Sequence, residues 1–533
     1  MDFVKRCEGF IMNNKKERER QELHKTIWAM ANELRGAVDG WDFKMYVLGF
    51  IFYRFISEYM ENFINQNEHD AGRLDYSYAN DTDENILTVK DYIVEAKGYC
   101  ILPSELFSNV VKRAKDDENL NMTLETIFRN IEESSKGSKA EKDFKGLFGD
   151  IDLNNQNKLG ITVADRNRRL TKILEAVASM NLGNVADHTI DAFGDAYEYL
   201  MGMYASTAGK SGGEFYTPQE VSNLLARLAI MDKKEINKVY DYACGSASLL
   251  LQPAKILGVD KVRLGFYGQE INPTTYNLAR INMFLHGIEY TKFDIECADT
   301  LTDPKNRDDE PFEVIVSNPP YSIKWVGDDD VTLINDDRYS PAGVLAPKGK
   351  ADWAFLMHAL ASLAPNGVAA NVVFPGILYR GGAEQKIRKY MVDNNYIDTV
   401  IQLPDNLFYG TSIATCILVL KKDLHMDHSI RFIDATKHCI KVTNSNKLTD
   451  DNIKEIYDMY MNRSEDVQYE ARTVDYEEIV KNDYNLSVST YVEKENTREK
   501  IDIKELNKKI AETVARENEL RLAIDEIIKE IEG

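Results

Sequence analysis

The stretch FEVIVSNPPYSIKW, residues 312–325, is a run of strand-forming residues that ends in two prolines. Proline has no amide hydrogen and cannot continue a ladder of hydrogen bonds, so a strand predicted over Phe312–Ser317 has to stop there. An ordinary turn would use Gly, Asn or Asp and would not need a tyrosine. The amide, the two rigid rings and the aromatic ring of residues 318–321 therefore indicate a site at the end of a strand.

Short apolar segments alternate with helical patterns on both sides of this stretch. Strands are predicted over residues 238–242, 264–269, 312–317, 369–374, 397–402 and 413–420, with a helix over 352–363. This alternation is typical of an α/β fold with a doubly wound, mostly parallel sheet. Ligands bind such sheets at the carboxyl ends of the strands, where residues 318–321 lie.

The remaining parts of the chain have helical patterns. Residues 24–60 carry apolar clusters at helical spacing, which we interpret as two helices broken near Gly40, and residues 65–84 look like a polar loop. Residues 1–180 are predicted to form a helical N-terminal domain, or alternatively the helical flank of one larger fold. The α/β domain is expected over 181–470, followed by a helical tail over 471–533.

The tail carries an apolar stripe close to heptad spacing, interrupted at Thr513 and Glu517. Its members are residues 503, 506, 510, 520, 524, 527 and 531. A terminal amphipathic helix buries such a stripe either on its own domain or on a partner, and both alternatives stay open.

Composition narrows the class of protein. A chain of 533 residues is too long for one ordinary core, so two or three domains are expected. Its longest apolar stretch, residues 45–53, is far shorter than the ~20 residues of a membrane span, and the N-terminus has no sustained apolar segment for export. Six scattered cysteines without metal-site spacing suit the cytoplasm, and no metal is predicted. The net charge of −22 argues against unaided binding to a nucleic acid backbone and suggests a partner.

A second strand end has the features of a cofactor loop. In VYDYACGSASLLL, residues 239–251, a strand ends at Asp241, a turn of small residues contains Gly245, and a helix is expected to begin near Ser248. Small residues let a cofactor approach the backbone, and a helix N-terminus offers unpaired amides. The dinucleotide pattern GxGxxG is absent.

Two further strand ends are acidic. Glu270, in YGQEINP, is placed to accept hydrogen bonds from a ribose diol, or to act as the acid at the start of the next helix, and both roles are compatible. Asp299, in CADTL, is a candidate acceptor for the amino group of an adenine ring. Together with the loop after Asp241, these strand ends favour an adenosine-containing cofactor.

The chemistry of an exocyclic amino group explains residues 318–321. That nitrogen is a poor nucleophile because its lone pair is delocalised into the ring, so an enzyme that alkylates it must accept both of its hydrogens in fixed directions. Asn318 offers its side-chain oxygen and Pro319 its backbone carbonyl, and the prolines hold both acceptors in place beforehand. Tyr321 offers a flat face to a base swung out of its helix.

These motifs resemble those of a known family. NPPY at 318–321 resembles the catalytic motif of amino-methyltransferases that use S-adenosylmethionine, DYACGSAS at 241–248 resembles their cofactor loop, and GGEFYTPQEVSNLLARL from Gly212 is similar to the segment that cradles the methionine end. The order of the three is that of adenine-N6 enzymes. Four more stretches resemble the modification subunit of type I restriction-modification systems: WAMANELRGAVDGWDFKMYVLGFIFYRFIS, DAFGDAYEYLMGMYAS, LYRGGAEQKIRKYM and LPDNLFYGTSIATCILVLKK. The resemblance spans roughly residues 20–490.

The resemblance implies a sheet of the S-adenosylmethionine-dependent methyltransferase type and a set of site residues. The implied catalytic residues are Asn318, Pro319, Pro320 and Tyr321, with Tyr321 and Phe408 stacking on the flipped adenine. The implied cofactor-binding residues are Glu214, Phe215, Tyr216, Thr217, Pro218, Gln219, Asp241, Gly245, Ser246, Ala247, Ser248, Glu270 and Asp299. Three positions depart from the family pattern: Tyr242 replaces a proline, and Ala247 and Ser248 replace a more glycine-rich pair, which predicts a tighter loop and an altered cofactor affinity.

The partners follow from the same resemblance. No sizeable sequence-reading insert follows NPPY, so sequence reading is expected to belong to a specificity subunit. A restriction (translocase and nuclease) subunit, double-stranded DNA and a second copy of the chain complete the implied assembly, and no membrane is involved. Two other functions stay open: a methyltransferase acting on glutamine in protein, and a scaffold that has lost turnover. The loop over residues 325–350 is expected to be mobile until DNA binds.

Overall fold

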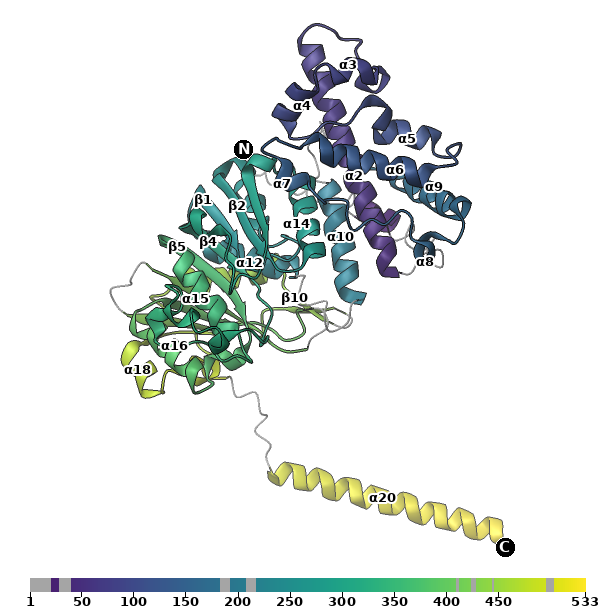
Figure 1. Ribbon diagram of the computed structural model, residues 1–533. Coiled ribbons are helices and arrows are strands. Elements are labelled where there is room, and N and C mark those ends of the chain that lie inside the picture. The colour runs from purple at the N-terminus through teal and green to yellow at the C-terminus, as the bar shows by residue number, and fades with distance from the viewer. Residues whose placement is uncertain are drawn as a thin grey trace, which may run out of the picture. The chain divides into compact units, whose positions relative to one another are not determined.

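The structure is a computed structural model that describes residues 21–27, 40–182, 192–207, 217–408, 412–422, 428–442, 445–494 and 503–533 (Figure 1). The chain divides into two compact units, Met1–Val492 and Glu493–Gly533. No helix in the described ranges combines the length and the apolar character that crossing a membrane requires.

Helices make up the N-terminal part of the first unit. They are α2 (Gly40–Asp70), α3 (Asp83–Leu87), α4 (Lys90–Lys97), α5 (Phe107–Arg113), α6 (Leu120–Ser134), α7 (Glu141–Phe144), α8 (Gln156–Leu159), α9 (Val163–Ser179) and α10 (Ala192–Thr207). The long helix α2 packs against α5, α9 and α10, and its buried aromatic residues fill the centre of this part. The predicted break near Gly40 coincides with the start of α2. The predicted loop at 65–84 is wrong at both ends, because α2 continues to Asp70 and α3 begins at Asp83.

A sheet of nine strands forms the rest of the unit, in the order β11-β8-β6-β7-β5-β4-β1-β2-β3. The strands are β1 (Ile236–Asp241), β2 (Val262–Glu270), β3 (Phe293–Cys297), β4 (Phe312–Ser317), β5 (Leu363–Val373), β6 (Ile397–Gln402), β7 (Cys416–Lys421), β8 (Ser429–Asp434) and β11 (Ala471–Asp475). Strand β7 runs antiparallel to β5 and β6, β11 runs antiparallel to β8, and the other pairs are parallel. The mostly parallel, doubly wound sheet is therefore confirmed.

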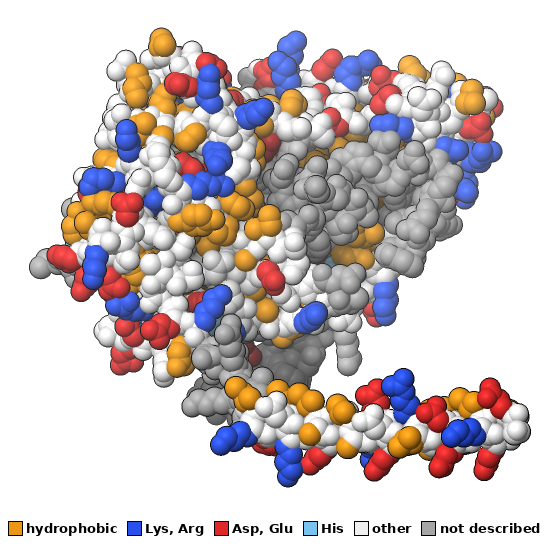
Figure 2. Space-filling model, turned by 90° about the horizontal axis from the view of Figure 1, so that it is seen from below, with side chains coloured by type: hydrophobic (Ala, Val, Ile, Leu, Met, Phe, Trp, Pro, Cys, Tyr) orange, Lys and Arg blue, Asp and Glu red, His pale blue; other side chains and the backbone are white. Residues whose placement is uncertain are grey.

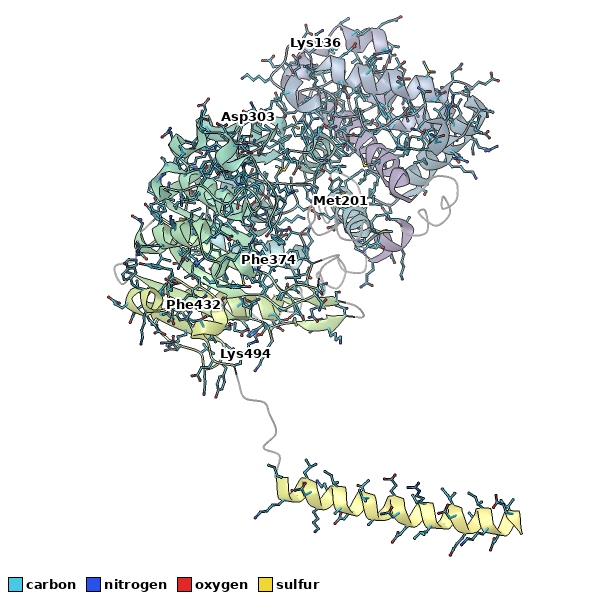
Figure 3. The ribbon with its side chains drawn as sticks, turned by 60° about the horizontal axis from the view of Figure 1, so that its bottom comes forward. Lys136, Met201, Asp303, Phe374, Phe432 and Lys494 are labelled. Atoms are coloured by element: carbon cyan, nitrogen blue, oxygen red, sulfur yellow. The ribbon has the colours of Figure 1, made fainter. Side chains whose placement is uncertain are left out.

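Helices cover both faces of this sheet. One face packs against α12 (Gln219–Ile230), α13 (Gln252–Leu257), α14 (Pro273–Leu285) and α17 (Asp450–Met461), and the other against α15 (Asp352–Ser362), α16 (Ala383–Asp393), α18 (Tyr476–Lys481) and α19 (Val488–Tyr491). The alternation of a strand explains this: Val239 of β1 belongs to the first core and its neighbour Tyr240 to the second. Figure 3 shows these layers with side chains, including the buried Phe432 of β8.

Several predicted boundaries differ from the structure. Strands 312–317 and 397–402 are confirmed at both ends, but the helix expected near Ser248 begins at Gln252. The end of the α/β domain at residue 470 was placed too early, because β11 pairs with β8 inside the same sheet and the compact unit continues to Val492. Strand β11 carries mixed polar residues at the sheet's edge, so its sequence lacks the apolar run that marked the central strands.

Helix α14 joins the helical part to the sheet. The buried Arg280 donates from its guanidinium to the carbonyl oxygens of Lys142 and Lys145, at 2.9 and 3.1 Å, and Asp150 accepts from Thr274 at 2.8 Å. Phe284 packs against rings of the helical part. Helix α14 starts three residues after Glu270, a predicted cofactor contact. The helical part therefore helps to hold the chain segment that carries Glu270 in place.

The second unit contains α20 (Ile503–Glu532). No residue of this helix is buried, and Figure 2 shows rows of hydrophobic side chains along it. The predicted stripe is exposed at every member, with exposed fractions from 43% at Leu506 to 79% at Ile531. The helix therefore has an apolar face that its own unit does not cover.

Candidate active site

A pocket lies at the carboxyl ends of β1 and β4, which are parallel neighbours in the sheet. It brings together the turn after β1, Thr217 before α12, and Asn318 after β4. Its lining residues are Thr217, Asp241, Ala243, Cys244, Gly245, Ser246, Ser248, Leu249 and Asn318. The structure therefore joins three motifs that are separated by up to a hundred residues in the sequence.

Asp241 ends β1 and is almost completely buried, with 1% of its surface exposed. Its Oδ1 accepts hydrogen bonds from the Ser317 hydroxyl at 2.7 Å and from the Ala243 amide at 3.1 Å. Burial, with a smaller effect from the nearby Glu270, raises the pKa of Asp241 to about 7 against the effect of these two hydrogen bonds. A carboxyl group in this state can change its charge when a cation arrives.

The turn after β1 is held in an unusual backbone conformation. Gly245 has φ 53° and Ala247 has φ 63°, in the left-handed region that disfavours a residue with a Cβ by roughly 1–2 kcal/mol. The replacement of a glycine by Ala247 therefore adds strain to the turn. Tyr242 does not lie over it: its hydroxyl donates to Asn371 Oδ1 at 2.8 Å and its ring stacks on Phe355, so this replacement fills the core instead.

Glu270 closes the turn from the neighbouring strand. Its Oε2 accepts from the Gly245 amide at 3.0 Å and its Oε1 from the Asn272 amide at 2.8 Å, while burial raises its pKa. The cap of α14 is Asn272, whose side chain accepts from two amides of the first turn, and Glu270 accepts from the amide of this cap residue, so its role at the start of that helix stays a prediction. Each carboxylate oxygen keeps a second lone pair, which leaves the predicted ribose contact open.

Asp299 lies two residues beyond β3 and does not line the pocket. Its Oδ1 accepts from the Leu301 amide at 2.9 Å and its Oδ2 from the Thr302 hydroxyl at 3.0 Å. It is half-buried at the same edge of the sheet. The contact with an adenine ring stays a prediction.

The segment around FYTP is described in part. Glu214, Phe215 and Tyr216 lie outside the described residues. Thr217 is buried in the pocket wall, and Pro218 precedes the first helical residue of α12, Gln219.

The side chain of Gln219 belongs to a polar network that the sequence did not predict. Gln219 Nε2 donates to Glu198 of α10, and Gln219 Oε1 accepts from Gln252 at 2.6 Å. Glu198 is buried, with 7% exposed, and also accepts from the Ser248 hydroxyl at 3.2 Å, which lies 3.1 Å from the Ser246 hydroxyl. A carboxylate only accepts, so Ser248 donates to Glu198, Ser246 donates to Ser248, and lone pairs of the Ser246 oxygen remain for a ligand.

Asn318 is held at both ends of its amide. Its Nδ2 donates to Thr217 Oγ1 at 3.0 Å, and its Oδ1 accepts from the Tyr321 hydroxyl at 2.7 Å. Burial raises the pKa of Tyr321 well above its ordinary value, so the hydroxyl keeps its proton and remains a donor. Pro319 is buried, Pro320 is half-buried, and the strand end is thus fixed by its neighbours.

Phe408 is buried in this structure, with 4% of its surface exposed. It packs with Leu403 and Leu407 in the core on the α12 face of the sheet. Stacking on a flipped base therefore requires this ring to become exposed, and its role stays a prediction.

The comparison with known proteins agrees with this geometry. The family described as N-6 DNA Methylase matches residues 188–500, and the family described as HsdM N-terminal domain matches residues 23–177. The chain is 48% identical over 535 residues to the type I restriction enzyme MpnII methylase subunit of Mycoplasma pneumoniae, with 98% of both chains covered. It belongs to the N-6 DNA methylases of type I restriction systems. The resemblance proposed from the sequence is confirmed.

Further relatives of this methylase support the same assignment. It is 30% identical over 554 residues to the MjaVII methylase subunit of Methanocaldococcus jannaschii, covering 100% of this chain and 87% of that one. The crystal structure of a type I restriction-modification methyltransferase subunit from Streptococcus thermophilus matches with a TM-score of 0.80 and 37% identity, covering 89% of this chain and 100% of that one. The fold is thus shared over nearly the whole length.

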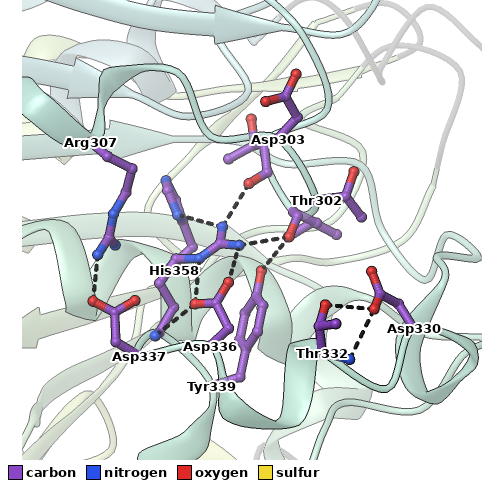
Figure 4. A network of polar contacts seen from close by, with 12 residues as sticks. Thr302, Asp303, Arg307, Asp330, Thr332, Asp336, Asp337, Tyr339 and His358 are labelled. Atoms are coloured by element: carbon purple, nitrogen blue, oxygen red, sulfur yellow. Dashed lines mark hydrogen bonds and ion pairs between the residues drawn. The ribbon is translucent and has the colours of Figure 1, made fainter.

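The loop over residues 325–350 of this methylase is anchored at its centre. Arg338 is 2% exposed and donates to the carbonyl oxygens of Thr300 and Leu301, at 2.8 and 2.9 Å, and to Asp336 (Figure 4). The Tyr339 hydroxyl donates to the same Leu301 oxygen at 3.0 Å. The mobility of this loop without DNA stays a prediction. These contacts predict that residues 338 and 339, at the centre of the loop, are held in place and that only the flanking parts move.

Three network residues were missed by the sequence analysis: Glu198, Gln252 and Asn282. Asn282 of α14 is buried and donates from Nδ2 to the Ser246 carbonyl at 2.8 Å. The only local signal was an acid between apolar residues in YEYLM, within a stretch already noted for its resemblance. Gln252 and Asn282 have no such signal, because only the fold brings them to the turn.

Proposed function

We propose that this chain is the modification subunit of a type I restriction-modification complex and methylates N6 of adenine in double-stranded DNA. The observation that carries the proposal is the convergence of Asn318 with the turn after β1 in one pocket. Asn318 offers an acceptor for an amino group, and the turn after β1 is the proposed cofactor site. Methyl transfer requires these two groups to face the same pocket, as they do here. The activity is that of an adenine-specific, site-specific DNA methyltransferase.

The residues of the pocket fit S-adenosylmethionine. When bound, this cofactor supplies an electrophilic methyl group on a positively charged sulfur. The small side chains of Ala243, Gly245 and Ser246 give it access to the backbone, and Asp241 in the pocket and Glu270 behind Gly245 offer acceptors for its ammonium and ribose groups. Thr217 closes the same pocket from the side of α12.

At the other end of the pocket, Asn318 and Tyr321 act on the adenine. Asn318 Oδ1 and the Pro319 carbonyl accept the two hydrogens of N6, which draws the nitrogen towards tetrahedral geometry and frees its lone pair for the methyl carbon. An amide oxygen has two lone pairs, so Oδ1 can keep the Tyr321 hydroxyl bond while it accepts one N6 hydrogen. The ring of Tyr321, and Phe408 once exposed, would stack on the flipped base.

The partners proposed for this chain are a specificity subunit, a restriction subunit, double-stranded DNA and a second copy of the chain, in the cytoplasm. The apolar face of α20, which its own unit does not cover, supports docking of the C-terminal helix on the specificity subunit, since a face of this kind is stable only when another surface covers it. The net charge of −22 supports the same division of labour, because most phosphate contacts must then come from another chain.

Sequencing of modified bases tests the proposal. Cells that express the chain with its specificity subunit should carry N6-methyladenine at one DNA sequence, and cells that express Asn318→Ala in its place should not. Methylated protein glutamine without methylated DNA would identify the glutamine-modifying alternative instead. Cofactor binding without any methylated product from the wild-type complex would identify a scaffold.

A further inference from the structure

An exposed hairpin stands at the edge of the sheet that carries the pocket. It consists of β9 (Ile440–Val442) and β10 (Ser445–Lys447), an antiparallel pair that Figure 1 labels at β10. It follows β8, which is parallel to β6. Through the pairings of β6 with β7, β7 with β5, and β5 with β4, strand β8 runs in the same direction as β4. The carboxyl end of β8, and the hairpin after it, therefore lie at the edge where Asn318 lies.

Hydrogen bonds hold the hairpin against residues 405 and 406. The Asn446 amide donates to the Asn406 carbonyl at 2.9 Å, and Asn446 Nδ2 donates to the carbonyl and the carboxylate of Asp405, at 2.9 and 2.8 Å. Residues 405–408 are the DNLF stretch that contains Phe408. On its other side, the charge of Lys447 lowers the pKa of the half-buried Glu220, in the first turn of α12, against the larger effect of burial, which raises it. The hairpin thus spans from the DNLF stretch to the helix that follows Thr217.

The hairpin region is basic in an acidic chain. Residues 435–449 contain three lysines and no acid, between Asp434 and Asp450. Lys441 and Lys447 are both exposed on the hairpin strands. A chain with 87 acids in 533 residues would place two or three of them in such a stretch by chance, so this stretch is basic within an acidic chain, with Asp405 and Glu220 as its acidic neighbours.

A flipped nucleotide explains a basic surface in this place. When a base leaves the duplex and enters a pocket, the phosphates on either side of it are drawn to the pocket's rim. The walls of the pocket carry the carboxyl groups of Asp241 and, behind Gly245, Glu270, which repel phosphate. Positive charge offsets this repulsion, and the hairpin carries it beside the DNLF stretch, which contains the aromatic residue predicted to stack on the base.

We infer that the β9–β10 hairpin binds the DNA backbone beside the flipped adenine, with Lys441 and Lys447 contacting phosphates. The inference rests on the proposed function and adds a DNA contact made by this chain itself. Exposed Ile440 and Val442 also suit a protein partner, but two exposed lysines with no acid in fifteen residues favour a polyanion over the surface of another subunit.

Charge reversal in the complex with the specificity subunit tests the inference. The variant is Lys441→Glu with Lys447→Glu, and the matched control is Lys234→Glu with Lys261→Glu. Lys234 and Lys261 are exposed and precede β1 and β2, at the opposite edge of the sheet, so the control makes the same change of net charge away from the pocket. The probe is a short duplex containing a sequence that the wild-type complex methylates, and binding is measured over a range of salt concentrations.

The hairpin variant should bind this duplex at least tenfold more weakly at low salt, while the control binds it within about twofold of wild type. Its slope of log affinity against log salt should fall by roughly 2, since each lost phosphate contact removes ~0.9. Binding of S-adenosylmethionine should not change. Unchanged DNA affinity and slope would overturn the inference, as would failure of the variant to join the specificity subunit, which would assign the hairpin to a protein interface. If the wild-type complex neither binds nor methylates DNA, the proposed function itself fails.

Discussion

At one end of the pocket, which we call the cofactor end, Asp241 and Glu270 each already accept two hydrogen bonds from the protein. At the other, the base end, Asn318 accepts from Tyr321 and Phe408 is buried in the core. The cofactor end is thus assembled before any ligand arrives, whereas the base end is closed on itself. The difference indicates that the cofactor binds to a site that is already formed. The residues at the base end, in contrast, have to rearrange when the adenine binds.

Asn318→Ala should show the largest effect, because it removes the acceptor at the base end and leaves the cofactor end intact. We expect DNA methylation to fall by ~100–1000-fold, the range seen when one preorganised transition-state contact is lost. The dissociation constant for S-adenosylmethionine should stay within about twofold of wild type. Single-turnover methylation and calorimetric titration of the same preparation give the two values, and methylation near the wild-type rate would refute the mechanism.

Glu270→Ala should act at the cofactor end. Loss of a charged hydrogen-bond partner should weaken S-adenosylmethionine binding by roughly 1.5–3 kcal/mol, because the carboxylate both closes the turn at Gly245 and accepts from the ligand. Asp299→Ala tests the other acidic strand end at this edge separately, since neither carboxylate lines the pocket and Glu270 alone closes its turn. Equal affinity in wild type and a folded Glu270→Ala variant would remove Glu270 from the site.

The pH dependence of cofactor binding follows from Asp241. Its pKa of about 7 lies above the ~3.9 of an unfolded aspartate, so the free folded protein holds a proton between these values. This group's contribution to the free energy of unfolding therefore falls as the pH rises from about 4 to about 7. A cationic ligand favours the ionised form, so S-adenosylmethionine should bind up to ~10-fold more tightly at pH 8 than at pH 6, the ratio that one such titration allows.

Calorimetry in buffers of different ionisation enthalpy would measure the protons released on binding at pH 6. Asp241→Asn provides the comparison, because it keeps the shape of the side chain but cannot titrate. A wild-type affinity that is flat between pH 6 and pH 8, with no proton release, would contradict a role for Asp241 towards the cation. Because Glu270 interacts with Asp241, the measured pKa belongs to the pair.

The same contrast explains how far the sequence could lead. Residues 312–321 predicted a strand end with an acceptor, because prolines and an asparagine leave few other structures, and the strand is confirmed at both ends. The turn after Asp241 and the position of Glu270 followed from the alternation of strands and helices. The bond between Tyr321 and Asn318, the buried state of Phe408 and the link from Glu198 to Ser248 depend on how distant segments pack, and no local pattern encodes such contacts.

Tyr321→Phe should show the smallest effect and bears most directly on the base end. Stacking alone predicts little loss from this change, because a phenylalanine ring still stacks on a base. The structure adds that the Tyr321 hydroxyl donates to Asn318 Oδ1 at 2.7 Å, and the loss of a neutral hydrogen bond costs about 0.5–1.5 kcal/mol. If this bond holds the amide oxygen in its productive orientation, kcat should fall by ~2–10-fold while the KM for DNA stays near wild type.

A faster Tyr321→Phe variant would show instead that the Tyr321 hydroxyl blocks the base end. If the hydroxyl instead competes with the adenine amino group for Asn318 Oδ1, Tyr321→Phe frees the acceptor, and kcat should rise or the KM for DNA should fall. Tyr321→Ala separates stacking from hydrogen bonding, because it removes both and should cost a further ~1–3 kcal/mol through lost contact with the base. A Tyr321→Ala variant no slower than Tyr321→Phe would show that the ring does not stack on the base, and Asn318 would then act without an aromatic partner at this position.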